Sequence, residues 1–178
     1  PIGEALQVLY WYYPEAIHQN VKWWLRTGEE GFARDAAVAL ARWSYAFPTL
    51  DTPTTYINEV VAKTGNVGRE SRFRRRGTTS GFYRWYTQYH QIMYDYDQLY
   101  DYIVSNPDIA RSVNRFVPWV KTPQDVIELI DVYLVQTTAK RILRYQYHTG
   151  EMKIAAIATL VGDTRITDPW MEWLFSRT

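Results

Sequence analysis

Apolar residues recur at helical spacing along most of this chain, and that periodicity constrains its fold more than any other feature. Residues 15–26 carry one such stripe, and residues 32–47 carry another that is rich in small side chains: Ile17, Val21, Trp24 and Leu25, then Ala36, Ala37, Leu40, Ala41 and Trp43 or Ser44. Residues three or four apart share one face of a helix, so both stripes predict amphipathic helices. No segment alternates as a strand does, and we therefore expect an all-α fold.

Proline, glycine and capping residues divide the rest of the chain into further helices. Pro48 should end the second helix, and Asn106-Pro107 and Pro118 should end later ones. Besides a short helix at 55–63, four more helices are expected at 82–104, 108–117, 122–147 and 152–162, and a last one from Thr167 to Phe175. The apolar face of 82–104 leaves Asp95, Asp97 and Asp101 on other faces. Thr122, Pro123 and Asp125 form a typical helix start. Consecutive helices of this kind predict antiparallel hairpins, which can stack into toroids or solenoids.

Composition limits the classes of partner. The 178 residues fit a single domain, and 20 basic against 19 acidic residues give a net charge of +1. Such a balance provides no general attraction for nucleic acid or for an anionic membrane, so we expect neither as a partner. Cysteine is absent and histidine occurs three times, so we expect neither a metal site nor a cofactor. His18 and His90 fall within aromatic helices and are interpreted as packing or hydrogen-bonded residues.

A long basic connection covers residues 64–80. It holds the run Arg72-Phe73-Arg74-Arg75-Arg76, and planar guanidinium groups suit sulfates and carboxylates. Arg74, Arg75 and Arg76 are therefore candidate ligands for an anionic substrate, although a solvated loop explains the run as well. We expect residues 69–80 to face the same side as the end of the 122–147 helix.

The segment Arg144-Tyr145-Gln146-Tyr147-His148-Thr149-Gly150-Glu151 carries the strongest chemical signal. A carboxylate can hold a histidine in one orientation while the other ring nitrogen meets a negative group. The simpler interpretation is a turn between helices, because Arg26-Thr27-Gly28-Glu29 has the same last three residues.

Together with the small-residue helix 152–162 and the closing Trp170-Met171-Glu172-Trp173-Leu174-Phe175, this segment resembles the heparinase II/III-like polysaccharide lyases. The resemblance covers about two-thirds of the chain. It implies that the helices form part of an incomplete (α/α) toroid. It also implies cleavage of an anionic, uronate-containing polysaccharide by β-elimination, in a bacterial protein that is periplasmic or secreted.

Site roles follow from the same resemblance. His148 would neutralise the uronate carboxylate and Glu151 would orient it, while Arg144, Tyr147 and Trp85, with the arginines above, would bind substrate. The family's tyrosine base lies in a stretch beyond the place where this chain stops, at Thr178, and a β-rich domain follows it. We therefore expect one part of a larger lyase, inactive in isolation, that needs the remainder of the enzyme.

Two other function classes stay open. An exposed apolar patch would favour a non-catalytic helical module that binds a protein partner. Two carboxyl groups facing one cavity within about 10 Å would favour a helical-toroid glycoside hydrolase.

Overall fold

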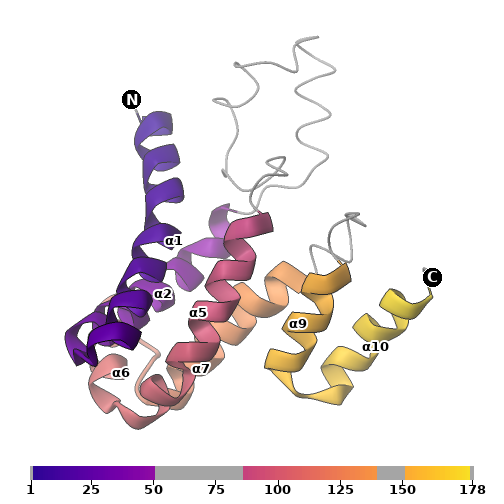
Figure 1. Cartoon of the computed structure of the whole chain (residues 1–178). Coiled ribbons are helices and arrows are strands. Elements are labelled where there is room, and N and C mark those ends of the chain that lie inside the picture. Colours follow the sequence, from indigo (N-terminus) through magenta and orange to yellow (C-terminus); the bar gives the residue numbers. More distant parts are fainter. Residues whose placement is uncertain (1, 51–85, 140–150, 177–178) are drawn as a thin grey trace.

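The computed structural model describes residues 2–50, 86–139 and 151–176, and these are helical apart from short turns (Figure 1). Side chains are described from residue 12 to 47, from 91 to 139, at 155 and from 157 to 176. The elements are α1 (Ile2–Thr27), α2 (Glu30–Leu50), α5 (Tyr86–Ser105), α6 (Pro107–Asn114), α7 (Pro123–Ile130), the π-helical η2 (Asp131–Gln136), α9 (Glu151–Val161) and α10 (Thr164–Phe175). No strand occurs in these ranges, so the all-α prediction is confirmed for them.

Helix α2 lies at the centre of the fold and packs against α1, α5, α6, α7 and η2. Its predicted stripe is buried: Ala36, Ala37, Leu40, Ala41, Trp43 and Ser44. Ala33, which the prediction did not include, is buried as well. Small side chains let neighbouring backbones come close, and the Ser44 hydroxyl is satisfied by donating to the Leu40 carbonyl oxygen at 2.8 Å. The small-residue stripe thus explains why one helix can have so many neighbours.

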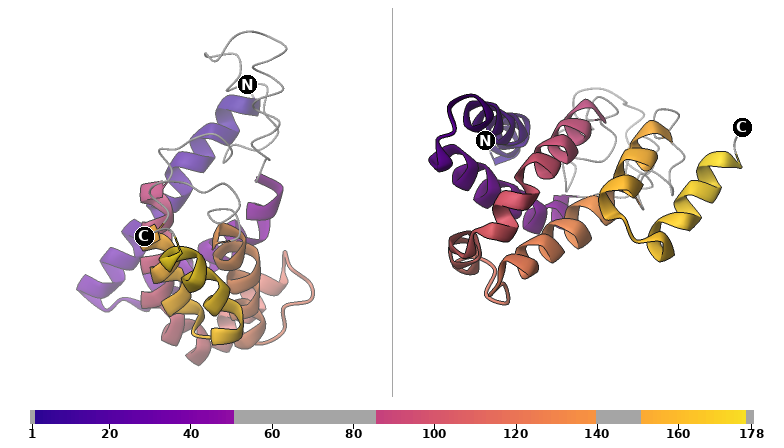
Figure 2. Two further views of the ribbon diagram at one scale, coloured as in Figure 1. Left: turned by 90° about the vertical axis from the view of Figure 1, so that its right-hand side faces the viewer. Right: turned by 60° about the horizontal axis from the view of Figure 1, so that its bottom comes forward.

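Helices α1 and α2 form the predicted antiparallel hairpin (Figure 2). The connection turns at Gly28, whose φ of 72° lies in the left-handed region. The Gly28 amide donates to the Trp24 carbonyl oxygen at 2.8 Å, and Glu30 begins the next helix. Thr27-Gly28-Glu29 is therefore a helix-to-helix turn here, as the simpler interpretation proposed.

Prolines end fewer helices than the sequence predicted. Helix α1 continues through a buried Pro14, and α2 continues past Pro48 to Leu50, so the prediction that Pro48 ends the helix is wrong. A proline inside a helix costs about 3 kcal/mol because it loses one hydrogen bond and strains the preceding turn. Burial of Ile17, Val21, Leu40 and Phe47 on these two helices supplies packing energy that offsets this cost.

Helices α5, α6 and α7 lie close to their predicted positions, with shifted ends. Helix α6 ends at Asn114, three residues before the predicted limit of 117, because the Asn114 side-chain amide donates to the carbonyl oxygens of Pro118 and Val120 in the loop. At the start of α7 the Thr122 hydroxyl accepts from the Asp125 amide and the Asp125 carboxylate accepts from the Thr122 amide. This capping box confirms the predicted helix start.

The 122–147 helix is not regular over its described part. The turn at η2 is wider than an α-helical turn, and the Thr137 hydroxyl donates to the Val132 carbonyl oxygen five residues back. One extra residue in a turn shifts every later side chain around the axis. Val126, Ile130 and Leu134 are still buried as predicted, whereas Tyr133 is half-buried.

The last two helices pack on each other, and α9 also packs on α5 and η2. Helix α9 confirms the helix predicted at 152–162, and Gly162 follows it with φ of 63°. Helix α10 begins at Thr164 rather than at Thr167, because the Asp163 carboxylate caps it by accepting from the Arg165 amide at 3.0 Å. In the described part of the chain no helix is both long enough and apolar enough to cross a membrane.

Candidate functional site

Most residues of the site predicted from the sequence fall outside the described residues. These are Arg74, Arg75, Arg76, Trp85, Arg144, Tyr147 and His148, and the proposed facing of residues 69–80 falls there too. Glu151 is the first residue of α9, but its side chain is not described. The assignments of these residues therefore stay predictions.

The helix ends that border these positions can be located. The C-terminal end of α2 and the N-terminal ends of α5 and α9 all lie towards the upper end of the fold in Figure 1. Helix α9 packs on both α5 and η2, so these elements are true neighbours. The described helices therefore lead into both segments that carry predicted site residues, 51–85 and 140–150, at the same end of the fold.

A buried polar cluster joins α1 to α5. The Nδ1 atom of His18 lies 2.9 Å from Oδ1 of Asp95, and the side-chain amide of Gln91 donates to the same oxygen at 3.4 Å. Asp95 is fully buried, and its second oxygen has no hydrogen-bond partner among the described residues. The expected placement of Asp95 away from the apolar face was wrong, whereas the interpretation of His18 as a hydrogen-bonded residue is confirmed. The side chain of His90 is not described.

Burial raises the pKa of Asp95, and the hydrogen bonds from His18 and Gln91 only partly offset that effect. A buried carboxyl group beside a histidine is an arrangement that general acid–base chemistry uses. It is also a common way to fasten two helices together. No sequence signal marked the pair, because its members lie 77 residues apart.

A second contact to a carboxylate, made by a tyrosine, involves the next residue of α5. The hydroxyl of the buried Tyr96 donates to Oδ1 of Asp131 at 2.8 Å, at the first residue of η2. Burial raises the pKa of Tyr96, and the negative charge of Asp131 raises it further. Burial likewise raises the pKa of Asp131. Because Tyr96 is 2% exposed, this contact positions η2 on α5 rather than offering a reactive phenol to a ligand.

One open groove has the composition of an anion-binding surface, and we call it the arginine groove. It measures about 560 Å³ and lies where α2 meets α6 and the turn after it, with Tyr13 of α1 at its edge. Its charged and aromatic lining consists of Tyr13, Arg34, Asp35, Arg42, Arg115 and Phe116. The sequence did not suggest it, because its arginines come from segments about seventy residues apart with no shared motif.

Of the three arginines that line the arginine groove, only Arg34 is paired with a carboxylate among the described residues. Arg34 and Asp35 form an exposed ion pair at 3.4 Å. Arg42 holds its guanidinium 5.6 Å from the centre of the Phe116 ring, and neither Arg42 nor Arg115 is paired with a carboxylate among the described residues. Burial raises the pKa of Tyr13, while the nearby Arg42 cation partly offsets the rise. The groove thus carries unneutralised positive charge.

An exposed aromatic cluster brings together one ring from α2, one from η2 and one from the turn before α7. Tyr133 of η2 is 6.3 Å from Tyr45 and 6.5 Å from Trp119, measured between ring centres. Tyr45 and Trp119 are each more than 40% exposed, as is the adjacent Val132. Rings of this kind suit either a protein partner or a sugar face.

Among the described residues, no group of three or more histidine, aspartate or glutamate side chains is placed to hold a metal ion. Comparison with known proteins gives no match to a family model, to a curated protein or to a solved structure.

Proposed function

We propose that this chain is one part of a heparinase II/III-like polysaccharide lyase, which cleaves an anionic, uronate-containing polysaccharide by β-elimination. The support comes from the position of the helix ends. The end of α2 and the starts of α5 and α9 lie on one side of the fold, and the chain segments next to them, 51–85 and 140–150, carry the basic run 72–76 and His148. We therefore propose that these two segments meet the same substrate, one with guanidinium groups and the other with a histidine.

Cleavage by β-elimination requires three functions of such a site. The uronate carboxylate must be neutralised, a base must take the proton on C5, and an acid must protonate the leaving oxygen. A preplaced donor at the carboxylate lowers the barrier because it meets the negative charge that builds up as the proton leaves. We propose His148 for this donor and Glu151 as the group that orients it. Arg74, Arg75, Arg76, Trp85, Arg144 and Tyr147 are proposed to bind the substrate.

The proposal also covers the missing catalytic base and the location of the protein. The base is expected on the remainder of the enzyme, so this chain alone is expected to show no turnover. We further propose a bacterial periplasmic or secreted location, where anionic polysaccharides are available as substrates.

The test uses the complete protein that contains this chain. Release of unsaturated uronate, followed by its ultraviolet absorbance, is measured on glycosaminoglycans, alginate and ulvan. His148→Ala should lower turnover by roughly two to four orders of magnitude, the effect of losing one charge-stabilising donor.

Arg26→Ala is the matched control, because Arg26 occupies the position before the other Thr-Gly-Glu turn. It should leave turnover unchanged. Normal turnover in the His148 variant would remove His148 from the mechanism, and absence of unsaturated product on every polysaccharide would overturn the proposed reaction.

The aromatic cluster favours a second candidate, a non-catalytic helical module that binds a partner. Tyr45 and Trp119 are both exposed and both lie against Tyr133, as a docking surface requires. This candidate predicts a complete protein that releases no unsaturated product. It also predicts that Trp119→Ala weakens binding to the partner while the fold stays intact.

A further inference from the structure

The arginine groove is separate from the residues assigned to the proposed lyase site. It lies between α2 and α6, and none of its lining residues is among those assigned to that site.

The volume and the apolar lining of the arginine groove fit a small molecule. A volume of about 560 Å³ falls in the range of pockets that hold small ligands, roughly 300–1,000 Å³. Val38 and Ala39 are half-buried and contribute apolar surface, and the Phe116 ring lies beside them. Ser112 adds a hydroxyl group that can donate or accept a hydrogen bond. An occupant with an apolar or ring-shaped body would thus find both contact area and a polar anchor.

Its charge fits an anion. The Arg34–Asp35 ion pair neutralises one guanidinium, which leaves Arg42 and Arg115 as the net charge of the groove. The contact with Phe116 restricts where the Arg42 guanidinium can lie, so less side-chain freedom is lost when a ligand binds. A guanidinium presents parallel N–H donors that match the paired oxygens of a carboxylate, sulfate or phosphate.

We infer that the arginine groove binds a small organic anion. Its carboxylate, sulfate or phosphate group pairs with Arg42 and Arg115. Its body lies against Val38, Ala39 and Phe116. This inference goes beyond the proposed lyase reaction and does not depend on it, because binding here requires neither His148 nor turnover.

Isothermal titration calorimetry on this chain tests the inference with named probes. Glucuronate and glucose compare the same ring with and without a carboxylate, and inorganic sulfate and inorganic phosphate compare the possible anionic groups. Glucuronate is expected to bind and glucose is not. Whichever inorganic anion competes with glucuronate identifies the preferred group. Affinity should fall as salt concentration rises, because the pairing is largely electrostatic.

Substitutions locate the binding. Arg42→Gln and Arg115→Gln should each weaken glucuronate binding roughly ten- to a hundredfold, the effect of losing one charged hydrogen-bonding group. Arg111→Gln is the matched control, since Arg111 lies on α6, pairs with Asp108 and does not line the groove. It should bind as the unchanged chain does. Circular dichroism and thermal unfolding check that each variant is folded.

Three results would overturn the inference. The first is that neither glucuronate nor sulfate nor phosphate binds. The second is that the Arg111 control loses as much affinity as the groove variants, and the third is that neither groove variant loses affinity. Binding of an acidic peptide such as oligoglutamate without binding of any small anion would also overturn it, in favour of a protein partner. The proposed lyase function is tested by turnover, so either proposal can fail without the other.

Discussion

His18 on α1 and Asp95 on α5 approach to 2.9 Å between Nδ1 and Oδ1, and this contact fastens two helices across 77 residues of sequence. The carboxyl group is completely buried, and only one of its two oxygens has a hydrogen-bond partner among the described residues. Burial of an ionisable group makes the stability of a fold depend on pH.

Asp95→Asn should reveal that dependence. Burial raises the pKa of Asp95 above its ordinary value of 3.8, so the folded chain holds this proton more tightly than the unfolded chain does. The stabilising effect of the proton is complete below 3.8 and is lost as pH rises through the raised pKa. Asparagine cannot ionise. The free energy of unfolding of the variant, minus that of the unchanged chain, should therefore increase with pH across this window and then level off.

Urea unfolding at a series of pH values measures this difference. Asp131 also has a raised pKa, but it is present in both proteins and cancels in the subtraction. A difference that stays constant, or that decreases as pH rises, would show that the charged form of Asp95 does not destabilise the fold.

His18→Ala should destabilise the chain by about 1–3 kcal/mol, because it leaves a buried carboxyl group with only the long 3.4 Å bond from Gln91. The cost should be smaller at acidic pH, where Asp95 is protonated and needs less compensation. Chemical unfolding of His18→Ala, Asp95→Ala and the double variant gives the coupling between the two residues. If the two single effects simply add, then the contact contributes nothing of its own.

Tyr96→Phe should cost about 1–2 kcal/mol, since it removes the 2.8 Å hydrogen bond to Asp131 without changing the ring. That hydrogen bond lowers the pKa of Asp131 against the effect of burial, so its loss should raise this pKa further. The cost of the substitution should accordingly be greater at neutral pH than in acid. Thermal and urea unfolding measure both effects.

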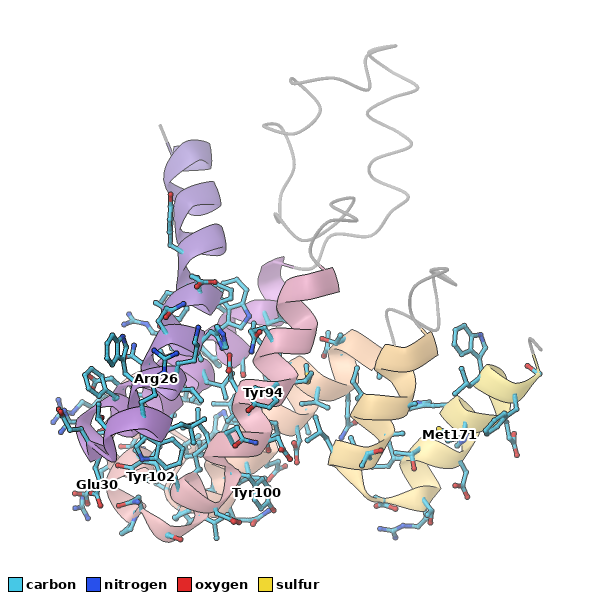
Figure 3. All side chains as sticks on the ribbon, in the orientation of Figure 1. Arg26, Glu30, Tyr94, Tyr100, Tyr102 and Met171 are labelled. Carbon is cyan, nitrogen blue, oxygen red and sulfur yellow. The ribbon has the colours of Figure 1, made fainter. Side chains whose placement is uncertain are left out.

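Tyr94→Phe is the control for this substitution. Tyr94 lies on the exposed side of the same helix, with 51% of its surface accessible (Figure 3). Its change should stay within about 0.5 kcal/mol. Equal losses at both positions would mean that the Tyr96 hydroxyl has no special role.

Features that depend on nearby residues were predictable from the sequence. The buried stripe of α2 follows from Ala36, Ala37 and Leu40 at helical spacing, and the start of α7 follows from Thr122, Pro123 and Asp125. In each case the interacting groups lie within a few residues of one another. Local pattern and capping chemistry are then sufficient.

Features that depend on tertiary contacts were not predictable. Pro14 and Pro48 stand inside helices because packing outweighs their local cost, and the wide turn of η2 has no local signal. Asp95 looks like a surface residue until His18 is brought to it by the fold. The arginine groove has the same origin, whereas the site around His148 stays a prediction because it lies outside the described residues.

Gly28 and Gly31 provide a paired test of the turn between α1 and α2. A Cβ atom at either position would meet nothing within 4 Å, so steric crowding cannot distinguish them. Only Gly28 has a left-handed φ, at 72°. Gly28→Ala should therefore destabilise the chain by about 1 kcal/mol, because a side chain disfavours that conformation. Gly31→Ala should stabilise it by about 0.5–1 kcal/mol, because alanine favours the helix that Gly31 belongs to.

Thermal unfolding of the two variants should thus shift in opposite directions, and Gly28→Asn should lose less than Gly28→Ala because asparagine tolerates a left-handed φ. Shifts of the same sign would mean that backbone conformation does not explain Gly28. The result also bears on the proposed site, because Thr149-Gly150-Glu151 repeats the sequence of this turn. The loss at Gly28 gives the size of a purely conformational effect. A loss of turnover in a Gly150→Ala variant of the complete protein, without a matching loss of stability, would then point to the chemistry of His148 and Glu151 rather than to the turn.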